Sequence, residues 1–264
     1  MTDQHGTPVG GMTYKVTNYL KADPKSTQVY GYFQVDFPYV WGEAASADFT
    51  YTTGCTSVSC KPLSFYNGGR ISQGASFYSN DAYTDTPAAS TQDHAEATYK
   101  ITIHPLGGTE VAGEWNSPYF RCDDQVPGSA AGCVMPNGRP VTDMRYLPTI
   151  SAGIRKVQSA PLHMGQPDSP NPLTRSTSPT VESDNRKAAC PVPGVPKPTT
   201  PAGTVWSCDE YPFATTLEGA AKTPPPNSGS VWVPKAENDS QGGTLSAFYA
   251  AQRVLNGDKF YVAA

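Results

Sequence analysis

The sequence predicts an α+β protein in which an N-terminal β-sandwich precedes a smaller unit with the order strand, strand, helix. Residues 26–37 (STQVYGYFQVDF) and 96–106 (EATYKITIHPL) alternate large apolar with polar side chains, the period of two that half-buried strands show. Residues 12–20 and 46–53 alternate more loosely, and no helical period of useful length occurs. We therefore expect a sandwich of about seven or eight strands over residues 1–125.

The middle of the chain has a different composition. Residues 126–183 include the Pro- and Ser-rich run PLHMGQPDSPNPLTRSTSPTVES. Such a composition resists regular structure and favours an extended linker or a long wrapping segment. We therefore expect the second compact unit to begin at residue 184.

Residues 184–264 predict that compact unit. Strands are expected at 203–208 (GTVWSC) and 228–235 (SGSVWVPK). Apolar side chains near helical spacing within 242–262 then predict a helix, which ends at the Asn-Gly pair 256–257 and is followed by a short final strand.

Charge is sparse and unevenly distributed. Charged residues make up 16% of the chain, and Gly, Pro and Tyr are abundant, a profile typical of a loop-rich extracellular protein. The net charge of −4 is unfavourable for a dedicated nucleic-acid binder, but residues 1–125 hold the acidity, with 7 Lys and Arg against 13 Asp and Glu. Residues 183–264 carry 7 of each, so a polyanionic substrate is not excluded there. No apolar run of about 18 residues occurs, so no membrane span is expected.

The six cysteines fall as near neighbours in the sequence. Local pairing predicts three disulfides and hence a secreted, extracellular protein. Six free thiols in a reducing cell are the alternative, whereas zinc is disfavoured because no CxxC pair occurs and no His lies near a Cys. The N-terminal residues lack a signal-peptide pattern, so we expect either a removed signal or a delivery route that uses none. The expected bridges are Cys55–Cys60, Cys122–Cys133 and Cys190–Cys208.

Two adjacent acids, Asp209 and Glu210, follow the first predicted strand of the C-terminal unit. One interpretation is a surface turn whose acids pair with Lys or Arg. The other is a hard-cation site, because Glu218 and further acids downstream supply oxygen ligands. No His follows His163, so a Ser–His–Asp triad, a Cys–His pair or a His-ligated zinc cannot form within 184–264. Any general base there must be a carboxylate.

Three segments of the C-terminal unit, in this order, resemble the secreted bacterial deoxyribonuclease family NucA/NucB: DNRKAAC (184–190), CDEYPFATTLEGA (208–220) and AENDSQGGTLSAFYAAQRVLNGDKFYV (236–262). The shared pattern is Asp-Glu-aromatic-Pro, then an acid-Gly pair, then an acid-Asn pair before a helix. The resemblance is confined to the C-terminal unit. It implies a ββα-metal-type nuclease domain and a secreted endonuclease that hydrolyses the phosphodiester bonds of DNA.

The resemblance also implies a role for each matched residue. Asp209 would be the general base, and Glu210 a supporting acid that helps to raise its pKa. Asn238, at the entry to the helix, would be a metal ligand, and Glu218 a second ligand or an organiser of the site. One divalent metal, Mg²⁺ or Mn²⁺, would neutralise charge on the scissile phosphate and stabilise the leaving 3′ oxygen.

Four basic residues are candidate phosphate contacts, and a solvated surface charge is the alternative for each. The chain also departs from the family pattern, with Glu237 where some members have Asp and Gln241 where a small residue is usual. No second helical metal ligand can be placed. The candidate phosphate contacts are Arg186, Lys187, Lys235 and Arg253.

Two other functions remain open. The nuclease unit could be toxin or effector cargo with the same chemistry, with residues 1–125 serving packaging or translocation and an inhibitor or immunity protein as a partner. Alternatively, the chain could be a non-catalytic secreted adhesion or carbohydrate-binding protein. Its sugar-binding face would use aromatic residues that could equally belong to the core, namely Tyr30, Tyr32, Tyr39 and Trp41.

Overall fold

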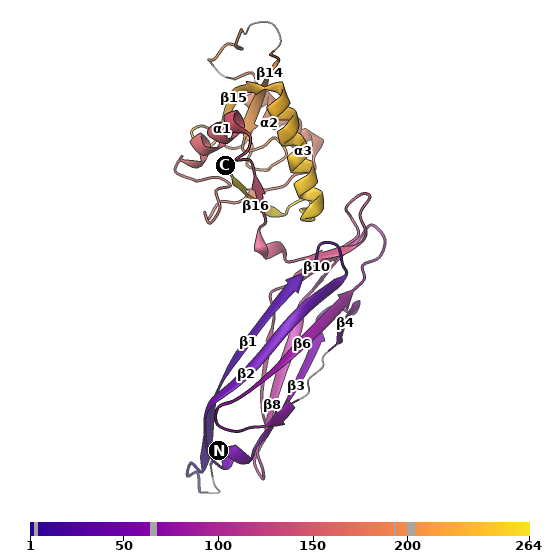
Figure 1. The fold of residues 1–264 in the computed structure, drawn as a ribbon, viewed down its shortest axis with the longest axis vertical. Coiled ribbons are helices and arrows are strands. Elements are labelled where there is room, and N and C mark those ends of the chain that lie inside the picture. Colours follow the sequence, from indigo (N-terminus) through magenta and orange to yellow (C-terminus); the bar gives the residue numbers. More distant parts are fainter. Residues whose placement is uncertain (3–4, 64–67, 193, 200–203) are drawn as a thin grey trace. The chain divides into compact units, whose positions relative to one another are not determined.

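The computed structural model describes residues 1–2, 5–63, 68–192, 194–199 and 204–264. The chain forms two compact units, Met1–Met135 and Pro136–Ala264, each with its own hydrophobic core (Figure 1). Strands dominate and a few helices lie in the second unit, so the predicted α+β class is confirmed.

The first unit is built from antiparallel sheets. Two four-stranded sheets have the orders β1-β2-β6-β4 and β5-β3-β8-β9, and a three-stranded sheet has the order β11-β10-β7. A short 3-10 helix, Glu43–Ser46, follows β2. The strands are β1 Gly10–Ala22, β2 Gln28–Gly42, β3 Asp48–Cys55, β4 Cys60–Leu63, β5 Gly68–Arg70, β6 Ala75–Asp85, β7 Gln92–Ala95, β8 Ala97–His104, β9 Val111–Asn116, β10 Phe120–Asp123 and β11 Gly132–Val134.

Alternation along the strands creates the core of this unit. Every second residue of β2 from Val29 to Phe37 is buried, and the residues between them face outward. Phe33 of β2 stacks on Tyr51 of β3, with ring centroids 3.9 Å apart, so side chains of the two four-stranded sheets pack in one core. The predicted sandwich is therefore present, and it rests on the period-two pattern of the sequence.

The described residues of the second unit include three α-helices, of which α1 and α3 contribute side chains to its core. Its sheets have the orders β12-β16-β13 and β14-β15, and all of their pairings are antiparallel except that of β12 with β16. Figure 1 shows α3 lying along the β14–β15 pair, and it follows β15 directly in the chain. The elements are a 3-10 turn Pro136–Gly138, β12 Val141–Asp143, α1 Pro148–Gln158, β13 Leu173–Thr174, α2 Pro179–Ala189, β14 Trp206–Tyr211, β15 Gly229–Pro234, α3 Lys235–Ala251 and β16 Lys259–Ala263.

The segment 126–183, expected as a linker, is largely part of the second unit. The division falls after Met135 rather than at residues 125 and 184. Helix α1 lies inside this segment and buries Ile150, Ile154 and Val157 at helical spacing in the core. Helix α2 begins in it as well. The Pro-rich composition obscured both helices, because proline is well tolerated in the first turn of a helix, where both of them carry it.

Helix α3 also differs from its predicted extent. It begins at Lys235, seven residues before the predicted start, and ends at Ala251, ahead of the Asn256-Gly257 pair. The first two turns contain few apolar residues, so the sequence shows no apolar periodicity that would predict them as helix. The two predicted strands correspond to β14 and β15, and Gly203, the first residue of the predicted 203–208 strand, lies outside the described residues.

Several tyrosines lie on the outside of the N-terminal unit. Tyr30, Tyr39 and Trp41 of β2 are exposed, and the half-buried Tyr32 stacks on Tyr19 of β1 with centroids 5.0 Å apart. These aromatics therefore do not belong to the core, and a carbohydrate-binding role for them stays a prediction. Within the described residues, no helix is both long enough and apolar enough to cross a membrane.

Candidate active site

Strand β14 carries Asp209 and Glu210 at the centre of the second unit. Asp209 pairs with Val231 of β15 and Glu210 with Ser230, so both acids sit within a regular antiparallel ladder. Neighbouring residues of a strand point to opposite faces. Asp209 is only 4% exposed and contacts α3, whereas Glu210 faces α2. Both acids nevertheless line one cavity of about 670 Å³.

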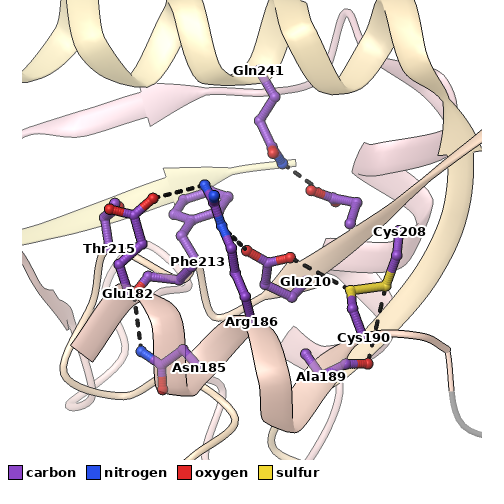
Figure 2. Close-up of polar contacts among 12 residues, drawn as sticks. Glu182, Asn185, Arg186, Ala189, Cys190, Cys208, Glu210, Phe213, Thr215 and Gln241 are labelled. Atoms are coloured by element: carbon purple, nitrogen blue, oxygen red, sulfur yellow. Dashed lines mark hydrogen bonds and ion pairs between the residues drawn. A yellow bond between two sulfur atoms is a disulfide. The ribbon is translucent and has the colours of Figure 1, made fainter. Parts of the chain in front are cut away.

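Helix α3 forms one wall of this cavity. The residues that line it recur every three or four positions, which places them on one face of the helix. Gln241, itself buried, donates from Nε2 to Oδ2 of Asp209 over 3.3 Å, and Figure 2 shows it reaching down from the helix. The lining residues of α3 are Asn238, Gln241, Gly242, Leu245, Ser246 and Tyr249.

Helix α2 supplies the charged opposite wall. Its first residues form a proper N-cap, in which Ser178 accepts a bond from the amide of Val181 and Pro179 follows it. Arg186 pairs with Glu182 at 2.8 Å, and its Nε lies 3.9 Å from Oε1 of Glu210 (Figure 2). The side chain of Arg186 is 62% exposed, and it lines the cavity.

The Cys190–Cys208 disulfide joins the end of α2 to β14. Cys190 follows the last residue of α2, and Cys208 directly precedes Asp209 on β14. Ser230 of β15 adds a hydrogen bond of 2.8 Å to the carbonyl of Ala189 at the end of the same helix. The C-terminal end of α2 is thus attached to both strands beside the two acids. The other expected bridges, Cys55–Cys60 and Cys122–Cys133, are also formed, and no free cysteine remains.

The surroundings of the two carboxylates disfavour negative charge. Burial, followed by the charge of Glu210, raises the pKa of Asp209 to about 7, although the hydrogen bond from Gln241 acts in the opposite direction. Burial also raises the pKa of Glu210, and the guanidinium of Arg186 offsets part of that effect. The charged residues that line the cavity are three acids and one base, Arg186, so its local balance is negative.

The donors around the cavity suit a hard cation that keeps part of its water shell. Carboxylate and amide oxygens come from Asp209, Glu210 and Asn238. In the described part of the chain, no group of three or more His, Cys, Asp or Glu side chains is arranged to hold a metal ion. Oxygen donors of this kind suit an ion of the Mg²⁺ type, which commonly uses one or two carboxylates and several waters.

Several of the predicted site residues lie away from the cavity. Glu218 is not among its lining residues, and its Oε2 accepts a 2.8 Å bond from the amide of Thr174. Lys187 is exposed outside the lining, and Lys235 pairs with Asp239 one turn along α3. Arg253 is 1% exposed, so it cannot contact a phosphate. Of the four basic candidates, only Arg186 lines the cavity.

Glu237, the acid before Asn238, has a structural role. Its carboxylate accepts bonds from the amides of Thr149 and Ile150, at 3.0 and 3.3 Å, and from the Thr149 hydroxyl at 2.9 Å. A carboxylate at this position satisfies unpaired amides in the first turn of α1 and complements the helix dipole. Glu237 therefore connects α3 to α1, while its charge contributes to the raised pKa of Asp209.

The sequence reasoning missed several lining residues. Gln241 is noted from the sequence only as a departure from the family pattern, Tyr249 only as an apolar position of the helix, and Glu182 not at all. With α3 starting at Lys235, the spacing of Asn238, Gln241, Leu245 and Tyr249 would have placed all four on one helix face. For Glu182, the useful signal was the Ser178-Pro179 helix start four residues earlier.

Comparison with known families bears on this unit alone. Residues 162–263 match the family model Deoxyribonuclease NucA/NucB. The match covers β13, α2, the β14–β15 pair, α3 and all of β16, and therefore the elements that build the cavity. The NucA/NucB resemblance of the C-terminal unit is thus confirmed over residues 162–263.

Comparisons with individual proteins add little. No curated protein matches the chain. Among solved structures, the GAE domain of yeast GGA1 is similar, with 10% sequence identity over 39% of this chain and 90% of that chain and a TM-score of 0.26. A similarity at this level supports no conclusion about the site or the fold.

Proposed function

We propose that the C-terminal unit is a metal-dependent endonuclease that hydrolyses DNA with Asp209 as the general base. The observation that carries the proposal is a buried carboxylate inside a cavity of the NucA/NucB domain, with a pKa raised to about 7. A base is most effective when its pKa lies near the working pH, and an ordinary aspartate is too acidic for this. All six cysteines are in disulfides, which fits an oxidising, extracellular location for the enzyme.

The charge of the cavity supports metal dependence. A DNA phosphate entering it meets Glu182, Asp209 and Glu210, with only Arg186 to attract it. One divalent cation, Mg²⁺ or Mn²⁺, held by Asn238 and Glu210 with water in its remaining positions, would offset this repulsion. When bound, the ion would neutralise charge on the scissile phosphate and on the leaving oxygen. Because Glu218 lies outside the lining, Glu210 replaces it here as the carboxylate ligand.

Each of these cavity residues then has its own role in the hydrolysis. Gln241 holds Oδ2 of Asp209, which leaves the other carboxylate oxygen to take a proton from water. The water oxygen attacks phosphorus as that proton moves to Asp209. The bond from phosphorus to the 3′ oxygen breaks, and the leaving oxygen keeps the electron pair and is protonated by solvent. Arg186 is placed to contact a non-bridging phosphate oxygen.

Plasmid cleavage by the full chain tests this function. We expect cleavage with Mg²⁺ or Mn²⁺ and none with EDTA. Asp209→Asn should lower the rate by about 10²–10⁴-fold, the contribution typical of a general base. Asp239→Asn is the matched control, because that carboxylate is on α3 but exposed and paired with Lys235. DNA left intact with every divalent metal would contradict the nuclease function, and full activity of Asp209→Asn would contradict only the assigned base.

A further inference from the structure

A second group of oxygen atoms lies in the N-terminal unit, at the end of β6. Asp85 is the last residue of this strand and pairs with Cys60 of β4. Asp93 of β7 is close enough for its charge to act on Asp85. The Cys55–Cys60 disulfide closes the short loop that carries Ser57 and Ser59 beside them. The family match begins at residue 162, so this group is not part of the nuclease domain.

Asp85 is the unusual member of this group. It is 0% exposed, and no hydrogen bond of standard geometry reaches its carboxylate oxygens, although Ser59 and Asp93 lie close enough to interact with them. Leaving a buried carboxylate without partners costs several kcal/mol, on the order expected for an unpaired buried ion. Burial is the largest cause that raises the pKa of Asp85 to about 6. The hydrogen bond from Ser59 acts in the opposite direction, Asp93 adds to the rise, and no Lys or Arg is among the groups that act on Asp85. A cation beside Asp85 would offset the cost of burying its charged form.

Its neighbours are oxygen donors held in place. The hydroxyls of Ser57 and Ser59 both donate to Oδ2 of Asp93, and they lie 2.9 Å from each other. The loop is fixed to the neighbouring chain by two bonds between Thr56 and Glu96, one of 3.0 Å from the Thr56 amide and one of 2.8 Å from the Glu96 amide. Lys61, the basic residue nearest in the sequence, instead donates to the carbonyl of Val58.

We propose that Asp85, Asp93 and the hydroxyls of Ser57 and Ser59 bind a calcium-type divalent cation. Calcium accepts carboxylates and neutral oxygens in a flexible geometry of six to eight ligands, whereas Mg²⁺ demands a near-ideal octahedron. Two carboxylates match its charge, and water fills the remaining positions. Asp93 is only half-buried, which gives the ion a route to Asp85 from solvent. With two acidic ligands, the Kd should lie on the order of 0.1–1 mM, as in extracellular modules.

Calorimetric titration of the EDTA-stripped full chain with CaCl₂ tests this site. We expect Ca²⁺ to bind and to raise the unfolding temperature, and Asp85→Asn to weaken that binding by about tenfold or more, because one of two charged ligands is lost. Asp93→Asn changes a half-exposed position and should weaken Ca²⁺ binding similarly. This variant replaces Asp85→Asn in the test if Asp85→Asn does not fold. Asp48→Asn is the matched control, since this exposed acid of the same unit pairs with Arg70.

The nuclease cavity could also take up metal, so the two sites must be separated. Asp209→Asn alters that cavity and should leave the calcium-dependent stabilisation intact, while Asp85→Asn should leave the rate of DNA cleavage unchanged. Failure of the wild-type chain to bind Ca²⁺ at about 10 mM, well above the range of extracellular sites, would overturn the proposal. So would equal Ca²⁺ affinity in the wild type and in both Asp85→Asn and Asp93→Asn. Neither result would affect the proposed nuclease function.

Discussion

At the scale of single residues, Asp209 shows why a base of this kind opposes stability. A carboxylate that is 4% exposed and has its pKa raised to about 7 is less favourable in its charged form than it would be in water. The hydrogen bond from Gln241 compensates for only part of this, because the net shift remains upward. The pKa that suits Asp209 to accept a proton therefore destabilises the fold at neutral pH.

This cost predicts a pH-dependent gain in stability for Asp209→Asn. The folded pKa of about 7 exceeds the ordinary value of 3.8, so the folded state holds a proton that the unfolded state releases, and stability falls as pH rises between these two values. Above pH 7 the variant should be more stable by up to about 4 kcal/mol, and near pH 4 the difference should vanish. Urea unfolding in EDTA at both pH values measures this difference.

Asp184→Asn provides the comparison, because Asp184 is an exposed acid on α2. Its substitution should change stability by a similar small amount at both pH values. An Asp209→Asn effect that is equal at pH 4 and pH 8 would show that the carboxylate does not titrate differently in the folded and unfolded states, and the proposed pKa of the base would then be wrong.

At the scale of elements, the sequence predicted most reliably where apolar periodicity was strong. The alternation in β2 and the apolar positions of β14 and β15 gave strands in the right order. The first two turns of α3 were missed because polar contacts hold them: Lys235 pairs with Asp239, and Glu237 bonds to the start of α1. The partner of Glu237 lies 88 residues away in the sequence and leaves no local signal, and the single Lys235–Asp239 pair does not by itself define a helix start. The cavity residues on that helix were therefore not grouped from the sequence.

The attachment of α2 to β14 yields a prediction about the Cys190–Cys208 disulfide. Replacing both cysteines by Ala should lower the stability of the C-terminal unit by about 3 kcal/mol, the loop-closure contribution for a separation of this size. Cleavage should fall as well, because Arg186 and Glu210 come from the two elements that the bridge joins. Urea unfolding and the plasmid assay measure the two effects.

The Cys122–Cys133 bridge supplies the control for that experiment. It joins directly opposite residues of β10 and β11 in the N-terminal unit. Its replacement by two Ala residues should destabilise that unit and leave the cleavage rate unchanged. Equal activity of the Cys190/Cys208 variant and the wild type would mean that the bridge does not position the site.

At the scale of the whole molecule, the two units have separate hydrophobic cores and different charge balances, and the family match concerns only the second. Residues 1–135 carry 7 Lys and Arg against 13 Asp and Glu, while residues 136–264 carry 12 against 10. The family match falls entirely within the second unit. The sequence predicted two compact units but not the boundary between them, because the recognisable motifs begin only at residue 184. Residues 136–183 of the unit carry no recognisable motif but supply core side chains. Met144, Leu147, Ile150 and Ile154 are buried in one core with Val233 and Phe260.

The boundary predicts how truncated chains behave. Residues 136–264 should fold alone and cleave DNA at a rate close to that of the full chain, since they contain the whole core and every cavity-lining residue. Residues 184–264 contain Asp209, Asn238 and Gln241 but lack α1, β12 and β13, so they expose the apolar side chains that α1 covers and lose the strands on both sides of β16. Each large core side chain that is lost lowers the free energy of unfolding by about 2–5 kcal/mol, so the loss of several exceeds the total stability of a domain of this size. We therefore expect the shorter chain to be unfolded by circular dichroism and inactive. Cleavage by residues 184–264 would show that the motif-bearing segment is itself the domain and that the preceding residues are a linker.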